Sequence, residues 1–181
     1  MKKRGTLIFI FLSILISSCV EPLDFNQADE LEFNPVFKST LIYFTVDQTD
    51  FIDLITGVNF VSNSSPLTVL KDPVIQENLL KAELEFVFNN TFDRDFTIEI
   101  SFLDNNNQIT YGFSPILIPP LSQNVKHLES ITIADNQLFL SSTKVRVQIA
   151  ISPSPDGSVL DPNNVRKLEL KSAGTYYLKY E

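Results

Sequence analysis

The sequence predicts an all-β protein, built as an antiparallel β-sandwich in which an immunoglobulin-like arrangement is one option. Apolar and polar residues alternate along several segments beyond residue 38, and turns rich in Asn, Asp and Pro separate these segments. About eight or nine short strands fit into this part of the chain, which is long enough to bury a core and fold as one domain. The chain has a single cysteine, so no intramolecular disulfide supports that core.

The four clearest strands are expected at 81–88, 96–102, 144–151 and 166–180. In each of them nearly every second residue is apolar, and most of the residues between are charged or polar. This period of two places one face on a core and the other in water, whereas a helix would spread both sets around its circumference. The pattern therefore predicts antiparallel strands that are half buried.

Segments with a less regular alternation predict the remaining elements of the sandwich. Further strands are expected at 39–46, 55–61, 108–113 and 125–133. The segment 115–122 contains three prolines, which suit an edge strand or a crossover. Residues 134–142 predict a short helix with Asp135 as its cap. Loops are expected at 89–95, 104–107 and 152–164, because Asn and Asp tolerate the backbone of tight turns.

The first residues carry a different pattern. Lys2, Lys3 and Arg4 precede an apolar run over 7–16, which is shorter than the roughly 20 residues that span a bilayer. Small residues then lead to the only cysteine, in the order Ile16-Ser17-Ser18-Cys19.

This tetrapeptide resembles the lipobox of bacterial lipoproteins. The resemblance implies that residues 1–18 are a signal peptide that is removed, and that the thiol of Cys19 carries a diacylglyceryl group. Two acyl chains make membrane attachment stable. Three alternatives stay open: an incidental cysteine in an ordinary cleaved signal, an uncleaved anchor residue, or a reactive thiol, although no thiolate-stabilising partner is in view.

An acidic segment follows the cysteine. Residues 19–37 are expected to form a lipidated tether, and 38–181 a single sandwich domain. Acidic residues soon after the lipidated cysteine resemble the surface-export signal of Bacteroidota lipoproteins, and Val20 stands where an Asp would resemble inner-membrane retention. The resemblance implies an outer-membrane lipoprotein, with the cell surface preferred over the periplasmic face.

The tether also contains aromatic residues. Phe25 and Phe33 are less easily explained by core packing than Phe37, which begins the domain. We expect Phe25 and Phe33, with the acidic Glu21 and Asp24, to contact a partner. A disordered leader is the alternative.

The charge of the chain excludes one class of partner. The full chain has a formal charge of −8 at pH 7, and removal of the three basic residues at its start brings this to about −11. Nucleic-acid binding depends on lysine and arginine neutralising phosphates, so it is not expected.

No catalytic or metal-binding pattern stands out, and neither an enzyme nor a cofactor is predicted. His127 is the only histidine, and no nucleophile motif accompanies it. One histidine and one cysteine cannot supply a zinc site. Acidic loops around Asp93, Asp104 and Asp156 are interpreted as turns rather than calcium sites, since none has the calcium-hand pattern. Two of the glutamates at 83, 85 and 99 could in principle form the carboxylate pair of a glycoside hydrolase, which needs a cleft and a defined separation. They alternate out of strands, however, as solvent-facing residues do.

Two functions follow from these features. The first is a non-enzymatic accessory subunit of an outer-membrane β-barrel complex. The second is a cell-surface module that binds a glycan or another ligand, with Tyr111, Tyr176 or Tyr177 as stacking platforms.

Overall fold

The computed structural model describes residues 34–52, 60–154, 156–161 and 163–179. The chain divides into two compact units, Met1–Glu32 and Phe33–Glu181. The first unit lies outside the described residues, and everything below concerns the second. No helix among the described residues is long and apolar enough to cross a membrane.

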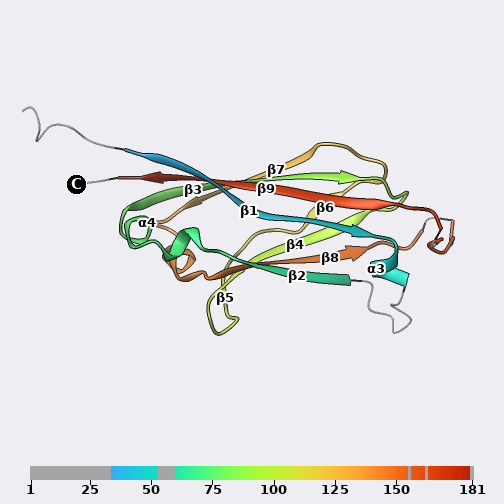
Figure 1. The fold of residues 1–181 in the computed structure, drawn as a ribbon, viewed down its shortest axis with the longest axis horizontal. Coiled ribbons are helices and arrows are strands. Elements are labelled where there is room, and N and C mark those ends of the chain that lie inside the picture. The colour runs from blue at the N-terminus through green and yellow to red at the C-terminus, as the bar shows by residue number, and fades with distance from the viewer. Residues whose placement is uncertain (1–33, 53–59, 155, 162, 180–181) are drawn as a thin grey trace, which may run out of the picture. The chain divides into compact units, whose positions relative to one another are not determined.

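Two antiparallel sheets form the second unit (Figure 1). The first sheet contains, in spatial order, β1 (Val36–Asp47), β9 (Lys167–Leu178), β3 (Leu79–Asn90) and β7 (Val125–Thr132). The second contains β2 (Phe60–Pro66), β8 (Lys144–Ile151), β4 (Phe96–Leu103) and β5 (Ile109–Gly112), and β6 (Ile116–Ile118) also pairs with β4. The predicted all-β sandwich is confirmed, and β1 begins two residues before the expected start of the domain.

The order of the strands is that of a jelly roll. Along the chain, β1, β3, β7 and β9 lie in one sheet, and each of the connections β1–β2, β2–β3, β3–β4, β7–β8 and β8–β9 changes sheets. An immunoglobulin domain keeps its first two strands in one sheet, whereas β1 and β2 lie in different sheets here. The immunoglobulin-like option was therefore wrong. Alternation along a strand predicts which face is buried, but it does not identify the neighbouring strand.

Aromatic side chains fill the space between the sheets. Phe86 and Phe88 of β3, and Phe96 and Phe102 of β4, are all fully buried. Each contributes about 1.5–3 kcal/mol through burial of its ring. These residues occupy the inward positions expected from the alternation, so the core is a direct consequence of the period of two.

Strand β9 carries two local adjustments. Both Leu41 and Ile42 of β1 are buried at an irregularity in the β1–β9 register, and the hydroxyl of Ser172 bonds both backbone groups of Ile42. At Gly174, an added Cβ would lie 2.5 Å from the hydroxyl oxygen of Tyr176. The ring of Tyr176 thus occupies the space that any other side chain would need.

The helices are short. They are α3 (Thr49–Ile52), η1 (Val69–Lys71), α4 (Pro73–Asn78) and η2 (Gln137–Ser141). The predicted helix over 134–142 is only the 3₁₀ turn η2, and Asn136 rather than Asp135 holds its cap position. The Asn136 side chain makes no capping bond to η2, and it donates instead to Thr132 O at 3.0 Å. The burial of Phe139, whose ring lies 5.1 Å from that of Phe102, favours this tight turn over a longer helix. Helix α4 was not predicted, although Asp72 caps it and Pro73 begins it.

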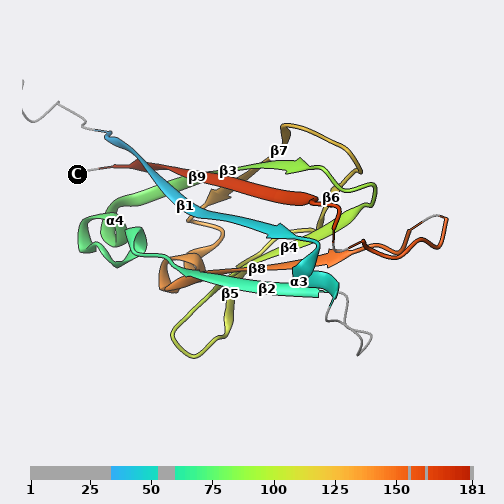
Figure 2. The ribbon, with the colours of Figure 1, turned by 45° about the vertical axis from the view of Figure 1, so that its right-hand side comes forward.

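The sandwich has two distinct ends, and both views agree on their placement (Figures 1 and 2). At the terminal end, Leu178 N donates to Pro35 O and Lys179 N donates to Asn78 O, which brings both ends of the described chain to α4. At the opposite end lie α3 and the segments 91–95, 152–154 and 156–161, called here the loop end. Strand β1, of 12 residues, separates them by about 35–40 Å.

Candidate functional site

The residues predicted to anchor the chain or to contact a partner are Cys19, Glu21, Asp24, Phe25 and Phe33. All five lie outside the described residues, so their roles stay predictions.

The acidic loops use their carboxylates for turns. Asp104 Oδ1 accepts hydrogen bonds from the backbone N–H groups of Asn106 and Gln108, each at 2.8 Å. Asp161 Oδ1 accepts from Asn163 N at 2.9 Å. Within the described residues, no group of three or more His, Cys, Asp or Glu side chains could hold a metal ion. This geometry fits the interpretation of the loops as turns.

The three glutamates considered as a catalytic pair do not face one another. Glu83 bonds Lys81 Nζ and the hydroxyl of Tyr177, each at 2.7 Å, and Glu85 lies 3.3 Å from the amine of Lys126. Glu99 belongs to the other sheet. Hydrolysis of a glycosidic bond needs two carboxyl groups across one cleft, which this arrangement does not provide.

The tyrosines expected as stacking platforms lie on different faces. Tyr176 is buried, and its burial raises its pKa to about 12. Tyr177 lies at the other face of the same sheet, where the amine of Lys81 is 5.4 Å from its ring centre. Tyr111 points into the sandwich and packs 5.9 Å from Phe139. They do not form a shared platform for a sugar.

A polar cluster closes one side of the sandwich, where β5 of one sheet faces β7 of the other. We call Tyr111, Phe113, His127 and Glu129 the seam cluster. The hydroxyl of Tyr111 donates to Glu129, and His127 Nε2 lies 3.5 Å from the second carboxylate oxygen. The rings of Phe113 and His127 stack at 5.1 Å. Burial, and then the bond to Glu129, raise the pKa of Tyr111 well above its ordinary value.

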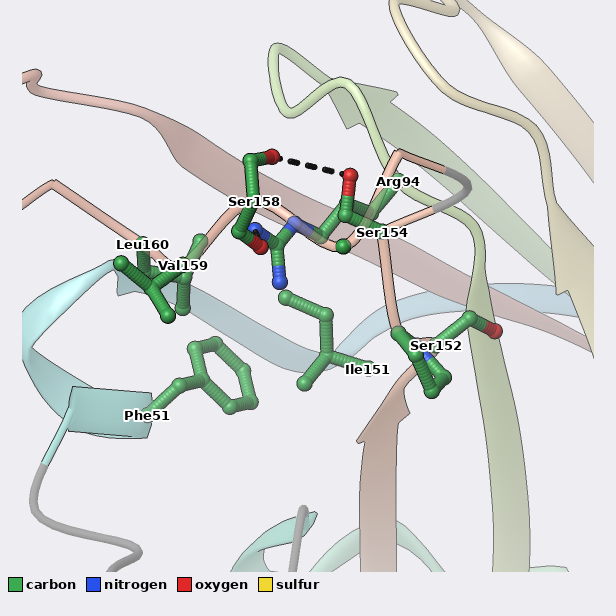
Figure 3. A pocket seen from close by; sticks show the side chains of 10 residues that line it. Phe51, Arg94, Ile151, Ser152, Ser154, Ser158, Val159 and Leu160 are labelled. Atoms are coloured by element: carbon green, nitrogen blue, oxygen red, sulfur yellow. Dashed lines mark hydrogen bonds between the residues drawn. The ribbon is translucent and has the colours of Figure 1, made fainter.

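The loop end contains a cavity of about 390 Å³ (Figure 3). Its apolar wall consists of Phe51 from α3, Ile151 at the end of β8, Val159 and Leu160. Its polar lining consists of Arg94 and the serines at 152, 154 and 158. Figure 3 shows the Arg94 side chain crossing the cavity, with its guanidinium between Ser158 and the apolar pair Phe51 and Ile151.

Strand ends and turn bonds position Arg94. Asn90, the last residue of β3, is buried and donates to Arg94 O at 2.9 Å and to Pro119 O at 2.8 Å. Its side-chain oxygen accepts from Phe92 N at 2.8 Å, which fixes the turn that precedes Arg94. Phe92 is fully buried and packs edge-on against Phe51 and Phe96. The core thus holds the turn, and the turn directs the arginine into the cavity.

Arg94 is unusual for an arginine because it is only 9% exposed. Its Nη2 donates to Ser158 O at 2.5 Å, and its Nε lies 3.7 Å from the carboxylate of Asp93, which is too far for a hydrogen bond. A guanidinium has five N–H groups, and among the described residues only Ser158, through its backbone oxygen, accepts a hydrogen bond from that of Arg94. The charge is buried and poorly compensated.

The segment opposite Arg94 is fixed by a carboxylate. Asp156 accepts from Ser154 Oγ at 2.5 Å and from Ser158 N at 2.9 Å, and these bonds hold its pKa well below its usual range. Gly157 follows with a φ of 73°, a conformation that glycine adopts without strain. Ser158 Oγ also lies 2.9 Å from Ser154 Oγ, so these three side chains support the polar rim of the cavity.

Sequence reasoning missed this site. Residues 89–95 and 152–164 were predicted as loops, but nothing in their composition indicates that Arg94 is buried. A single arginine between two aspartates ordinarily indicates an exposed turn. The cavity forms where β1 and β8 end and β4 begins, and these positions are far apart in the sequence.

No family model and no curated protein matches this chain. Among solved structures, the VP2 subviral particle of infectious bursal disease virus aligns with a TM-score of 0.45 at 11% identity, over 81% of this chain and 33% of that chain. A protein from Parabacteroides distasonis described as secreted aligns with a TM-score of 0.49 at 14% identity, over 65% of this chain and 38% of that chain.

An isomalto-dextranase of Arthrobacter globiformis, complexed with panose, aligns with a TM-score of 0.32 at 10% identity, over 64% of this chain and 16% of that chain. The chain therefore spans well under half the length of these solved structures. Similarity at this level carries no argument about function.

Proposed function

We propose that this chain is a non-enzymatic lipoprotein of the outer membrane, attached through a diacylglyceryl group on Cys19, whose jelly roll binds another protein through its loop end. The observation that carries the proposal is the opposition of the two ends. The described chain begins at the terminal end, and the cavity lies at the loop end, about 35–40 Å away along β1.

A tether that joins the domain at its terminal end leaves the loop end free to meet a partner. Anchoring in the membrane plane raises the effective concentration of that partner, so a modest interface suffices. The class of partner that we propose is an outer-membrane β-barrel protein or its complex. The acidic tether with Phe25 and Phe33 would supply a second contact.

The lining of the cavity supports a binding rather than a catalytic role. The described residues that line it include no His, Cys, Asp or Glu. The carboxylate beside its serines, that of Asp156, accepts from Ser154 Oγ and from Ser158 N, and it is exposed and has a pKa well below its usual range, which suits a turn rather than a general base. The only histidine belongs to the seam cluster, where it stacks on Phe113 and faces Glu129.

The anchor and the contact surface can be tested together in native membranes. A fatty-acid analogue of palmitate with a clickable group should label the wild-type chain and leave Cys19→Ala unlabelled. A photo-crosslinking residue at Val159, which is 88% exposed at the loop end, should capture one outer-membrane protein. The same residue at Val74, 42% exposed beside the terminal end, is the matched control. Equal capture from both positions, or labelling of Cys19→Ala, would contradict the proposal.

The cavity favours a second candidate, a cell-surface module that binds a small ligand or glycan. Its volume lies near the lower end of the roughly 300–1,000 Å³ typical of ligand sites. Capture of no protein from Val159, together with binding of a small molecule by the isolated chain, would favour this candidate over the first.

A further inference from the structure

The cavity at the loop end has the composition of a site for one kind of ligand. Its charged group is cationic and buried, its wall is apolar, and the described residues that line it carry no negative charge. Enclosing an arginine without full compensation is costly, and proteins ordinarily surround such a group with acceptors. Here the protein supplies one short bond from Nη2 to Ser158 O and a distant carboxylate at Asp93.

The geometry points to a binding site for a small carboxylate, whose charged group pairs with Arg94 and whose apolar group fills the space beside Phe51 and Ile151. A carboxylate is the planar anion that matches two parallel N–H groups of a guanidinium. The inference deepens the second proposed function, since it names the ligand class of the same cavity.

The apolar wall limits the ligand further. Phe51 and Ile151 are 5% and 8% exposed, so the ligand meets well-packed core side chains rather than mobile surface groups. The volume of about 390 Å³ accommodates one terminal group rather than a long chain. An N-acylated amino acid with an apolar side chain, as at the C-terminus of a peptide, has both required parts. A uronic acid has the carboxylate but lacks the apolar group.

Asp93 is the natural competitor of such a ligand. Its carboxylate lies 3.7 Å from Arg94 Nε, and its side chain is 54% exposed, so the pair is weak and solvated. Removing this carboxylate should therefore strengthen binding, whereas removing the arginine should abolish it. Two neighbouring substitutions with opposite expected effects make the assignment specific.

The test uses the full chain in detergent micelles, labelled with ¹⁵N at arginine. The chain has four arginines, at 4, 94, 146 and 166, so each Nε–H signal can be assigned by substitution. Titration with N-acetyl-leucine should shift the Arg94 signal and leave the Arg146 signal in place. A ligand of this size is expected to bind with a Kd of roughly millimolar order.

Three comparisons decide the outcome. N-acetyl-leucine amide, which has no charge, should produce no shift in the wild-type chain. Arg94→Gln should lower the affinity at least about tenfold, and Asp93→Asn should raise it roughly two- to fivefold. Arg166→Gln, which removes the same charge nearby, should change it little.

Equal binding of the acid and its amide would overturn the inference without requiring any variant to fold. Binding of glucuronic acid but not of N-acetyl-leucine would also overturn it, since the apolar wall would then have no role. The measurement does not depend on Cys19 or on a membrane partner. Its failure would therefore leave the proposed anchoring untouched.

Discussion

Two regions of the jelly roll bury polar groups, and they differ in how many hydrogen-bond partners those groups find within the protein. In the seam cluster, the hydroxyl of Tyr111 bonds Glu129, and His127 is enclosed by Glu129 and Phe113. In the loop-end cavity, Arg94 has space around it and one donor bonded to a described residue. The hydroxyl of Tyr111 and the carboxylate of Glu129 are paired within the protein, although the buried His127 Nε2 makes no hydrogen bond to a described residue. The buried Nε of Arg94 likewise has no described acceptor, and we propose that a ligand supplies an acceptor to this arginine.

The difference separates stability from binding. A polar cluster whose members bond one another stabilises the fold, and losing one member leaves the others unpaired. A buried charge that lacks partners contributes little to folding, but it favours any anion that can reach it. Substitutions in the seam cluster should therefore change the free energy of unfolding, and substitutions at Arg94 should change ligand binding.

The largest expected effect lies beneath the seam cluster. Phe102 is fully buried and packs 5.1 Å from Phe139 and 6.2 Å from Tyr111. Phe102→Ala should lower the free energy of unfolding by about 3–5 kcal/mol, through lost burial and the cavity that remains. Denaturant unfolding measures this. Phe37→Ala is the control, since Phe37 is 46% exposed on the edge strand β1, and a loss of equal size there would contradict the account.

A smaller effect is expected from the hydroxyl of Tyr111 alone. Tyr111→Phe keeps the ring contacts but leaves the carboxylate of Glu129 without this donor. The free energy of unfolding should fall by about 1–2 kcal/mol. Tyr43→Phe removes a hydroxyl from a side chain that is 60% exposed, and it should change stability by less than about 0.5 kcal/mol. Similar values for the two variants would mean that the seam bond does not stabilise the fold.

Because Tyr111 is partly buried and bonded to Glu129, the free energy of unfolding should depend on pH in the alkaline range. Burial raises the pKa of Tyr111, so the unfolded chain, whose phenol titrates near 10, releases this proton first. The stabilisation is complete below about pH 10, and it is lost as the pH rises toward the higher folded pKa. Chemical unfolding at pH 9 to 12 should show a shallower decline in Tyr111→Phe. Tyr176, whose pKa is about 12, is present in both proteins. The free energy of unfolding should therefore still decline with pH in Tyr111→Phe, but less steeply than in the wild type.

The smallest stability effect is expected at Arg94, despite its burial. Arg94→Gln removes a poorly compensated charge and one bond to Ser158 O, two changes of opposite sign. Its free energy of unfolding should stay within about 1 kcal/mol of the wild type in the absence of ligand. A loss of 3 kcal/mol or more would show that Arg94 acts mainly in folding.

Local patterns in the sequence predicted the strands but not their assembly. The alternation in 81–88, 96–102 and 144–151 corresponds to β3, β4 and β8, because a half-buried strand needs a period of two. The jelly-roll order depends on pairings between distant segments, such as β1 with β9, that no local pattern encodes. Helix α4 could have been predicted, because Asp72 and Pro73 form a standard helix start.

Local sequence patterns could not predict the candidate site either, because its residues come from segments that are far apart in the sequence. Phe51, Arg94 and Ile151 come from three distant segments, and they meet because the strand order places their ends together. The seam cluster likewise joins Tyr111 of β5 with Glu129 of β7 across two sheets. The sequence analysis considered His127 as the only histidine and Tyr111 as a stacking residue, but it could not predict that both lie beside Glu129.

The most direct test of this division between stability and binding is denaturant unfolding with and without N-acetyl-leucine. Ligand that binds the folded state alone raises the unfolding midpoint. We predict an equal rise in free energy of unfolding for the wild type and Tyr111→Phe, and no rise for Arg94→Gln. An equal rise in all three proteins, or the same rise with N-acetyl-leucine amide, would contradict the assignment of binding to Arg94.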